Sequence, residues 1–325
     1  MKIITLFVPL LLVFGCSSMN QIHDSGFIPI IEKPAFLKEA GPAVFIDEGH
    51  NNFHTMNGRY KPFADVLRKD GYKVFPHKGS FTKKSLKHVN ILVISNALHI
   101  SNLKSWSLPT PSAFSDEEII ILNEWVKSGG ALWLIADHMP IPGAAEKLAL
   151  SFGFKLMNGF AYIPGNKSHI RYSRDNGTLM DHIITRGLNK NEVIQSVYTY
   201  TGHAFKIPHG AEPILVFKKG SYSLNPKHAF KFDKDTAKFD ITSWSQGAVK
   251  KYGKGRIAMF GEAAAFTAQI AGKKRKKIGM NSSDAPYNLQ FILNIMHWLT
   301  GILNNNQSRH SNTLKSDAAN ISGAP

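Results

Sequence analysis

Short apolar runs that alternate with amphipathic segments predict the fold of this chain. Five runs have the length and composition of buried strands, because each is nearly all apolar and ends in polar residues: 43–47, 72–75, 90–95, 131–136 and 255–262. Amphipathic helices are predicted over 61–70, 116–128, 144–152 and 286–303. Strands that alternate with helices favour a sheet covered on both faces, so the pattern predicts an α/β fold with a mostly parallel sheet and flanking helices.

Local signals refine this outline. Ser115 and Glu118 have the spacing of a capping box, which starts a helix, and Gly129 follows that helix where a glycine commonly ends one. Over 160–245 the pattern changes to short alternating runs and turns, which predicts an added antiparallel β region in the same domain. The tail 304–325 is polar and poor in aromatic residues, so we expect it to be disordered.

The N-terminus has the pattern of a secretory signal peptide over 1–15. A basic start precedes an apolar run at 3–14 that is too short to span a membrane, and a small residue precedes Cys16. The tetrapeptide Val13-Phe14-Gly15-Cys16 resembles the bacterial lipobox, whose cysteine becomes the acylated N-terminus. We therefore expect a palmitate-type lipid on Cys16, a tether over 16–40 and a domain over 41–303. The alternative is an ordinary signal peptide that contains a cysteine by coincidence. By the same resemblance, Ser17 favours the outer membrane, facing the periplasm.

Cysteine content and charge narrow the possible functions. Cys16 is the only cysteine in the 325 residues, which excludes an internal disulfide, a Cys-rich zinc site and, once it is acylated, a cysteine nucleophile. A net charge of +16 would suggest nucleic acid as the partner of a cytosolic protein. Export argues against nucleic acid and favours an anionic envelope glycan or lipid. The basic run 273–277 lies between glycines and is predicted to be an exposed loop, whose simplest role is solubility.

Polar side chains follow several predicted strands, at the edge where open parallel sheets bind ligands. As candidate catalytic residues we take His50, Asp137, His138, Glu48 and Glu262. As candidate binding residues we take Asn51, His54, Arg59, Asn96 and Trp106.

Three interpretations of this edge remain open. Asp47, His50, His54 and His138 are acceptable ligands for a divalent metal such as zinc, although His50 and His54 follow a strand and do not form the helical His-Glu-x-x-His motif. A histidine paired with a carboxylate could equally act as a general acid or base. Alternatively, Asp47 caps a turn, the imidazoles bond to backbone and no ligand binds.

Three segments, 45–55, 136–140 and 255–263, resemble a bacterial lipoprotein family that carries a domain of unknown function in the class I glutamine-amidotransferase-like superfamily. The resemblance covers roughly 42–303 and implies a flavodoxin-like α/β fold. In true amidotransferases a cysteine at the elbow between strand and helix is activated by a downstream histidine. This chain has Asp137 and His138 at the elbow, so the resemblance implies a ligand site without glutaminase activity.

These observations leave three hypotheses for function. The first is a hydrolase that acts on a glycan or envelope component through histidine and carboxylate groups or one metal. The second is a non-catalytic lipoprotein that binds an envelope ligand or partner in the same crevice or through its basic surface. The third is an assembly role in which the crevice is vestigial. Fold alone does not separate them.

The lipid anchor can be tested directly. Globomycin or Cys16→Ser should block maturation, because the lipoprotein signal peptidase requires an acylated cysteine at the cleavage site. Immunoblotting of the precursor and mature bands measures the effect. Normal cleavage of the serine variant would contradict the lipid anchor.

Overall fold

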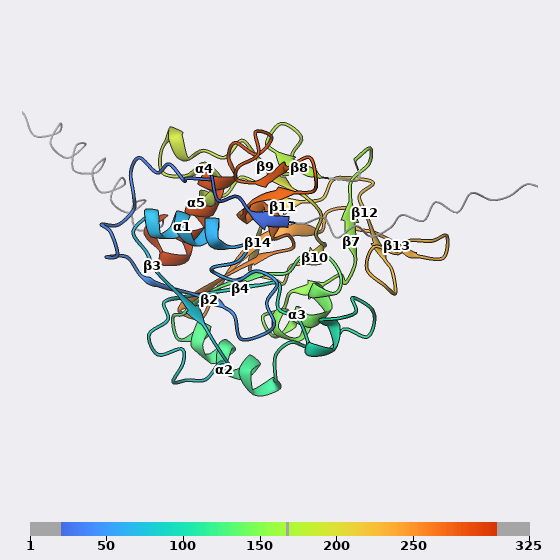
Figure 1. Cartoon of the computed structure of the whole chain (residues 1–325), viewed down its shortest axis with the longest axis horizontal. Helices are drawn as coiled ribbons and strands as arrows, with labels where there is room; N and C mark the ends of the chain where they lie inside the picture. Colours follow the sequence, from blue (N-terminus) through green and yellow to red (C-terminus); the bar gives the residue numbers. More distant parts are fainter. Residues whose placement is uncertain (1–20, 167–168, 304–325) are drawn as a thin grey trace, which may run out of the picture.

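The structure is a computed structural model that describes residues 21–166 and 169–303 (Figure 1). The signal peptide, Cys16 and the tail 304–325 lie outside the described residues, so the expectations for them stay predictions. No helix among the described residues has both the length and the apolar character needed to cross a membrane.

A nine-stranded mixed sheet forms the centre of the domain. Its order is β3-β2-β4-β5-β15-β14-β10-β6, and β11 also pairs with β14. The bounds are β2 Ala43–Asp47, β3 Lys73–His77, β4 Ile91–Ser95, β5 Ala131–Ile135, β6 Lys155–Leu156, β10 Phe205–Lys206, β11 Ala211–Val216, β14 Ser245–Tyr252 and β15 Gly255–Phe260. Strands β3, β2, β4, β5 and β15 pair in parallel, whereas β14 joins β15 antiparallel. The mixed α/β class is confirmed, but a mostly parallel sheet is not, because parallel pairing stops at β15.

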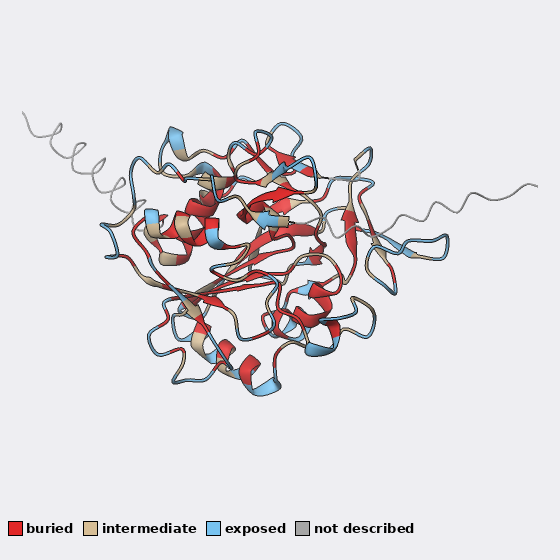
Figure 2. Ribbon diagram, viewed as in Figure 1, coloured by how far each residue is buried: buried red, intermediate tan, exposed pale blue. Residues whose placement is uncertain are grey.

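Helices cover both faces of this sheet (Figure 1). On one face lie α1 (Lys61–Lys69) and α5 (Asn288–Thr300), and on the other lie α2 (Asp116–Lys127) and α3 (Ile141–Ser151). The pleat of β5 explains the two cores: Trp133 packs with α1 and α5, while Leu132 and Leu134 pack with α2 and α3. Figure 2 shows that the sheet and the helix faces turned toward it are buried.

Antiparallel strands occupy the region 160–245, as the sequence pattern predicts, but they divide into several sheets. Some join the central sheet through β14, and the others form two small sheets, β13-β12-β7 and β8-β9. Their bounds are β7 Phe160–Tyr162, β8 Ile170–Ser173, β9 Ser196–Thr199, β12 Tyr222–Asn225 and β13 Ala237–Asp240, with a short helix α4 at Ile183–Arg186. Single 3-10 turns lie at Ile100–Asn102, Lys190–Glu192 and Ala264–Phe266.

The N-terminal segment is part of the domain from residue 21, which corrects the expected tether over 16–40. Strand β1 (Gln21–His23) pairs antiparallel with β16 (Ala268–Ala271), which continues into β17 (Lys276–Gly279). Phe27, Ile31 and Phe36 then pack against the core. These apolar side chains follow no regular period, so their pattern predicts neither a helix nor a strand.

Candidate functional site

The parallel strands bring their carboxyl ends to one edge of the sheet, where the sequence places most candidate residues. β5 lies between β4 and β15 in continuous register, so the loops that follow these strands are neighbours. The backbone N–H of Asp137 donates to Oδ1 of Asn96 at 2.9 Å. Asn96 adopts φ +52°, a left-handed conformation that asparagine tolerates better than most residues. Asn96 therefore connects the ends of β4 and β5 and positions the elbow.

His50 is buried between two carboxylates. Its Nδ1 donates to both oxygens of Asp47 at 3.0 Å, and its Nε2 donates to Oε1 of Glu118 at 3.0 Å. The ring also stacks on Phe81, with centroids 4.5 Å apart. Glu118 is the capping-box residue of α2, so its carboxylate also accepts from the backbone and hydroxyl of Ser115. This cluster fastens the loop after β2 to the start of α2.

Electrostatics keep His50 charged. Burial alone would lower the pKa of His50, but the hydrogen bonds and charges of Asp47 and Glu118 outweigh burial and raise the pKa above its ordinary value. Burial likewise opposes the ionised form of Glu118, yet hydrogen bonds from Ser115, His50 and Phe81 and the charge of His50 lower its pKa to about 2. Because both ring nitrogens are donors in this arrangement, His50 has no lone pair for a proton or a metal. These hydrogen bonds do not support the predicted catalytic and metal-ligand roles of His50, which stay predictions.

The rest of the first loop is also held by its own hydrogen bonds. Oε1 of Glu48 accepts from the backbone N–H of Met56 at 2.8 Å, and the side-chain amide of Asn51 donates to the carbonyl of Leu98 at 3.1 Å. The bond to Met56 gives Glu48 a loop-closing role, and its predicted catalytic role stays a prediction. Asn51, predicted to bind ligand, ties the loop to the segment after β4.

His54 is buried and uncharged. Its Nδ1 lies 3.4 Å from the hydroxyl of Ser95, and its ring packs on Tyr60 with centroids 4.6 Å apart. Burial and the nearby positive charge of Arg59 lower the pKa of His54 to about 3. His54 therefore contributes to packing beneath the edge, and nothing places it against a ligand.

The predicted metal set does not converge. Among residues 21–166 and 169–303, no group of three or more His, Cys, Asp or Glu side chains is arranged to hold a metal ion. Asp47 is occupied by His50, Gly49 and Asn52, and His54 is enclosed by Tyr60 and Ser95. The expectation of a zinc ligand set made of Asp47, His50, His54 and His138 is corrected accordingly.

Asp137 and His138 are half-buried and keep free polar atoms. Nδ1 of His138 donates to the carbonyl of Met139 at 2.9 Å, which leaves the lone pair on Nε2. This Nε2 makes no hydrogen bond to any described residue. Asp137 uses Oδ1 to accept from the backbone N–H of His138 at 2.8 Å, whereas its Oδ2 has no partner in the described part of the chain. The elbow thus offers one basic nitrogen and one carboxylate oxygen to a ligand.

An aromatic rim surrounds the elbow. We use this name for five side chains that pack around or beside His138: Phe53, Trp106, Phe160, Phe230 and Phe232. His138 stacks on Phe160 with centroids 4.5 Å apart and 14° between the rings, and Trp106 lies 5.8 Å from His138. Phe230 remains 54% exposed and Phe53 39% exposed. The rim is therefore a partly open aromatic surface beside polar groups.

Arg59 belongs to the same edge. Its guanidinium carbon lies 4.0 Å above the ring of Phe53, and its Nε donates to the carbonyl of Gln21 in β1 at 3.1 Å. Burial lowers the pKa of Arg59, while the negative charge of Asp137 acts in the opposite direction. Arg59 is thus placed near the elbow, as the sequence predicts for a binding residue.

Glu262 lies beneath the elbow and is fully occupied by backbone. Its two oxygens accept from the N–H groups of Ala264 and Ala265 at 2.8 Å. Burial, reinforced by the charge of Asp137, raises the pKa of Glu262 to about 8, although these backbone bonds act against the rise. At neutral pH the carboxyl group of Glu262 is therefore mostly protonated.

Sequence reasoning missed His203 and most of the aromatic rim. His203 is fully buried, its Nδ1 lies 3.1 Å from the carbonyls of Ala136 and Asp137, and its Nε2 has no partner in the described chain. Burial lowers the pKa of His203 to about 3, so this ring supports the elbow without charge. His203, Phe160 and Phe230 lie in the antiparallel region, far along the sequence from the strand ends, and no local signal connects them to the elbow.

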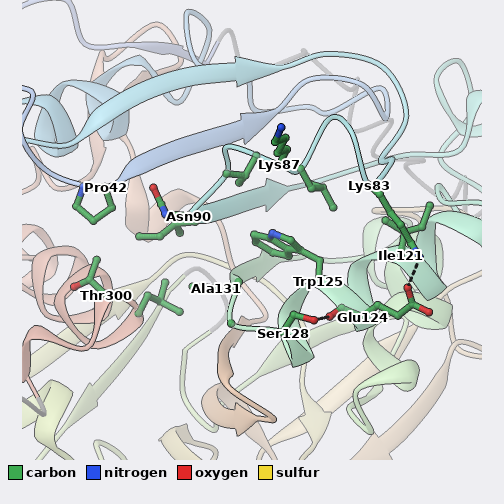
Figure 3. A pocket seen from close by; sticks show the side chains of 16 residues that line it. Pro42, Lys83, Lys87, Asn90, Ile121, Glu124, Trp125, Ser128, Ala131 and Thr300 are labelled. Carbon is green, nitrogen blue, oxygen red and sulfur yellow. Dashed lines mark hydrogen bonds and ion pairs between the residues drawn. The ribbon is translucent and has the colours of Figure 1, made fainter.

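A groove of about 690 Å³ lies at the opposite edge, between Pro42, Asn90, Trp125 and Thr300 (Figure 3). Its polar groups are largely satisfied. Lys83 pairs with Glu124 at 3.0 Å, and Oδ1 of Asn90 accepts from the N–H of Ala43 at 2.9 Å. The size of this groove favours it as a ligand site. We nevertheless assign the candidate site to the carboxyl edge, where the unpaired polar atoms of Asp137 and His138 lie beside the partly exposed aromatic rim.

Comparisons with known proteins show the fold alone. No protein-family model matches the chain, and no curated protein matches its sequence. The mmIFT52 N-terminal domain has a TM-score of 0.52 at 14% identity, over 79% of this chain and 97% of that domain. A cytoplasmic protein from Salmonella typhimurium LT2 has a TM-score of 0.45 at 12% identity, over 80% of this chain and 99% of its own. A ThuA-like protein from Bacteroides uniformis ATCC 8492 has a TM-score of 0.42 at 12% identity, over 84% of this chain and 94% of its own.

His50→Ala should destabilise the protein strongly, because it leaves two buried carboxylates without their cation. Breaking a buried ion pair by removing one partner costs roughly 3–5 kcal/mol. Denaturant unfolding followed by circular dichroism measures the change. His88→Ala, at an exposed histidine, is the control and should change the free energy of unfolding by less than about 0.5 kcal/mol.

The effect of His50→Ala should also depend on pH. The lowered pKa of Glu118 stabilises the fold above the ordinary value of 4.5, and this contribution is lost as pH falls toward about 2. The raised pKa of His50 stabilises the fold below the ordinary value of 6.5, and this contribution is lost as pH rises through the raised pKa. The difference between wild type and variant should therefore be largest between these two ranges. A difference that is small at every pH would contradict the charged bridge.

Proposed function

We propose that this chain is a lipid-anchored protein of the cell envelope, on the outer membrane facing the periplasm, whose glutamine-amidotransferase-like domain binds a glycan at the carboxyl edge of its sheet. The proposal combines three features. Cys16 provides the site for the lipid, and as the only cysteine it leaves the elbow without the amidotransferase nucleophile. The parallel strands place Asp137 and His138 at the elbow that the family resemblance identifies as the ligand site.

The aromatic rim carries the proposal. Exposed apolar surface bordered by polar groups marks binding sites, and ligand sites typically combine aromatic walls with a few placed polar atoms. Trp106 and Phe230 lie 27° from parallel, with centroids 6.3 Å apart, and Phe230 meets the stacked rings of His138 and Phe160 edge to face. Sugar rings have apolar C–H faces that pack on such surfaces, so a saccharide is the ligand class that suits the rim.

The polar groups of the edge suit the other faces of a sugar. Oδ2 of Asp137 and Nε2 of His138 can accept from hydroxyl groups, and Arg59 can donate. Arg59 also provides a positive charge for an acidic sugar or a phosphate substituent, which are common in envelope glycans. His50, His54 and Glu262 are buried and engaged, so binding fits the geometry better than catalysis by these groups.

Hydrolysis of the bound glycan is the second candidate, and one observation favours it. Two carboxyl groups, Asp137 and Glu262, come from neighbouring strand ends, and burial raises the pKa of Glu262 to about 8. Pairs of this kind divide the acid and base roles in many hydrolases. His138, with its free Nε2, would be the alternative base.

Calorimetric titration tests the binding proposal. The mature chain from residue 16 with Cys16→Ser is titrated with soluble fragments of peptidoglycan and with the polysaccharide of lipopolysaccharide. We expect saturable binding that Trp106→Ala weakens about ten-fold or more, as truncation of a central aromatic anchor does. Trp125→Ala, at the opposite edge, is the matched tryptophan control and should bind as the wild type does.

The same samples separate binding from hydrolysis. Mass spectrometry after incubation should show the glycan intact if the domain only binds, and cleaved if it hydrolyses. Cleavage that His138→Ala or Glu262→Gln abolishes would establish the second candidate. Equal affinity of the Trp106→Ala and Trp125→Ala variants, or no binding of either glycan, would contradict the assignment of the rim.

A further inference from the structure

The register of β1 places the start of the described chain beside a basic hairpin. Gln21 pairs with Ala271 and His23 pairs with Gln269, so β1 runs antiparallel to β16 with Gln21 at the turn end. The turn that follows β16 begins at Gly272 and leads into β17. The polypeptide that joins Cys16 to the domain therefore enters beside this turn.

The turn and the start of β17 form a concentrated positive surface, which we call the basic tip and define as residues 273–277. All five are Lys or Arg, and all five are exposed. None of them forms an ion pair with a described residue. Some exposed lysines elsewhere are paired, such as Lys61 with Asp65 and Lys147 with Asp116, and what distinguishes the tip is that five unpaired basic residues are consecutive. The basic tip thus keeps its charge free for a partner.

The hairpin presents these charges on a defined framework. Gly272 has φ +64° and Arg275 has φ +50°, and the N–H of Arg275 donates to the carbonyl of Gly272 at 3.0 Å, which closes the turn. Four consecutive residue pairs then hold β16 against β17. The sequence alone predicts an exposed loop here, and the structure shows a paired hairpin joined to the N-terminal strand.

Chain length limits how far the basic tip can lie from a lipid on Cys16. Four residues lie between Cys16 and Gln21, which makes five residue-to-residue steps. An extended chain spans at most about 3.6 Å per step, hence about 18 Å in all. A surface at that distance from the bilayer is within reach of its headgroup layer. Lipid chains combined with a polybasic patch are the usual two-signal arrangement for stable membrane attachment.

We propose that the basic tip binds the headgroups of an anionic phospholipid bilayer and orients the domain on the membrane. The proposal rests on the lipid anchor of the proposed function, because the anchor is what brings the tip to the bilayer. Binding by the basic tip would also fix the orientation of the domain relative to the membrane. The carbonyl of Gln21 accepts from Arg59 at 3.1 Å, so the strand beside the tip also contacts the candidate site, which would then lie close to the membrane surface.

Vesicle co-sedimentation tests the tip independently of the lipid. The mature chain from residue 16 with Cys16→Ser retains every described residue and lacks the acyl group. It should bind phosphatidylcholine vesicles that contain phosphatidylglycerol, and should not bind vesicles of phosphatidylcholine alone. Raising the salt concentration should weaken binding, because the attraction is screened.

Two charge-matched variants locate the interaction. Replacing residues 273–277 with glutamine should lower the partition coefficient by about a hundred-fold or more, since each basic residue near an anionic surface contributes on the order of 1 kcal/mol. The control variant removes five exposed lysines elsewhere by the substitutions K78Q, K84Q, K155Q, K190Q and K219Q. It should retain most of the binding.

The outcomes distinguish this proposal from the proposed function. Equal binding to both vesicle types, or equal loss in both variants, would overturn the basic tip as the membrane surface. Mass spectrometry of the mature protein from cells tests the anchor separately. An unmodified Cys16 would overturn the lipid anchor. The vesicle assay uses the Cys16→Ser chain, so its result would still decide whether the basic tip binds an anionic membrane.

Discussion

The carboxyl edge depends on one buried cation held between two carboxylates. Asp47 ends β2, Glu118 begins α2, and His50 bonds to both at 3.0 Å. Charges removed from water are costly unless every hydrogen bond is satisfied, and here the remaining lone pairs accept from Gly49, Asn52, Phe81 and Ser115. The bridge fixes the loop after β2, and that loop in turn supports Phe53 and Arg59 at the rim of the site.

Most of the central architecture could be predicted from the sequence because its signals are local. The apolar run at 43–47 became β2 with the same bounds, and the capping box at Ser115 starts α2 as predicted. The parallel half of the sheet follows from strands that alternate with helices. Local patterns carry no information on the pairing of β14 with β15 or of β1 with β16, since these depend on residues that are distant in sequence. The mixed sheet and the docked N-terminal segment were missed for that reason.

The candidate site shows why residue type predicts a location better than a role. His50, His54 and His138 all lie near the predicted edge, yet their surroundings give them three different states. Two carboxylates favour the charged form of His50, burial keeps His54 neutral, and His138 is half-buried with its Nδ1 bonded to the backbone. The partner that decides the state of His50 lies 68 positions away in Glu118, and the rings around His138 come from the antiparallel region. Sequence spacing does not contain these contacts.

The hydrogen bond from Arg59 to the carbonyl of Gln21 makes the first strand a part of the ligand edge. Detaching β1 from β16 would remove this hydrogen bond, one of the contacts that hold Arg59 over Phe53. By thermodynamic reciprocity, a ligand that requires Arg59 in that position must hold β1 in the sheet by the same free energy. If the proposed ligand requires Arg59 in that position, tension on the N-terminal segment would weaken its binding, and the edge strand would convert a mechanical load into a change of affinity.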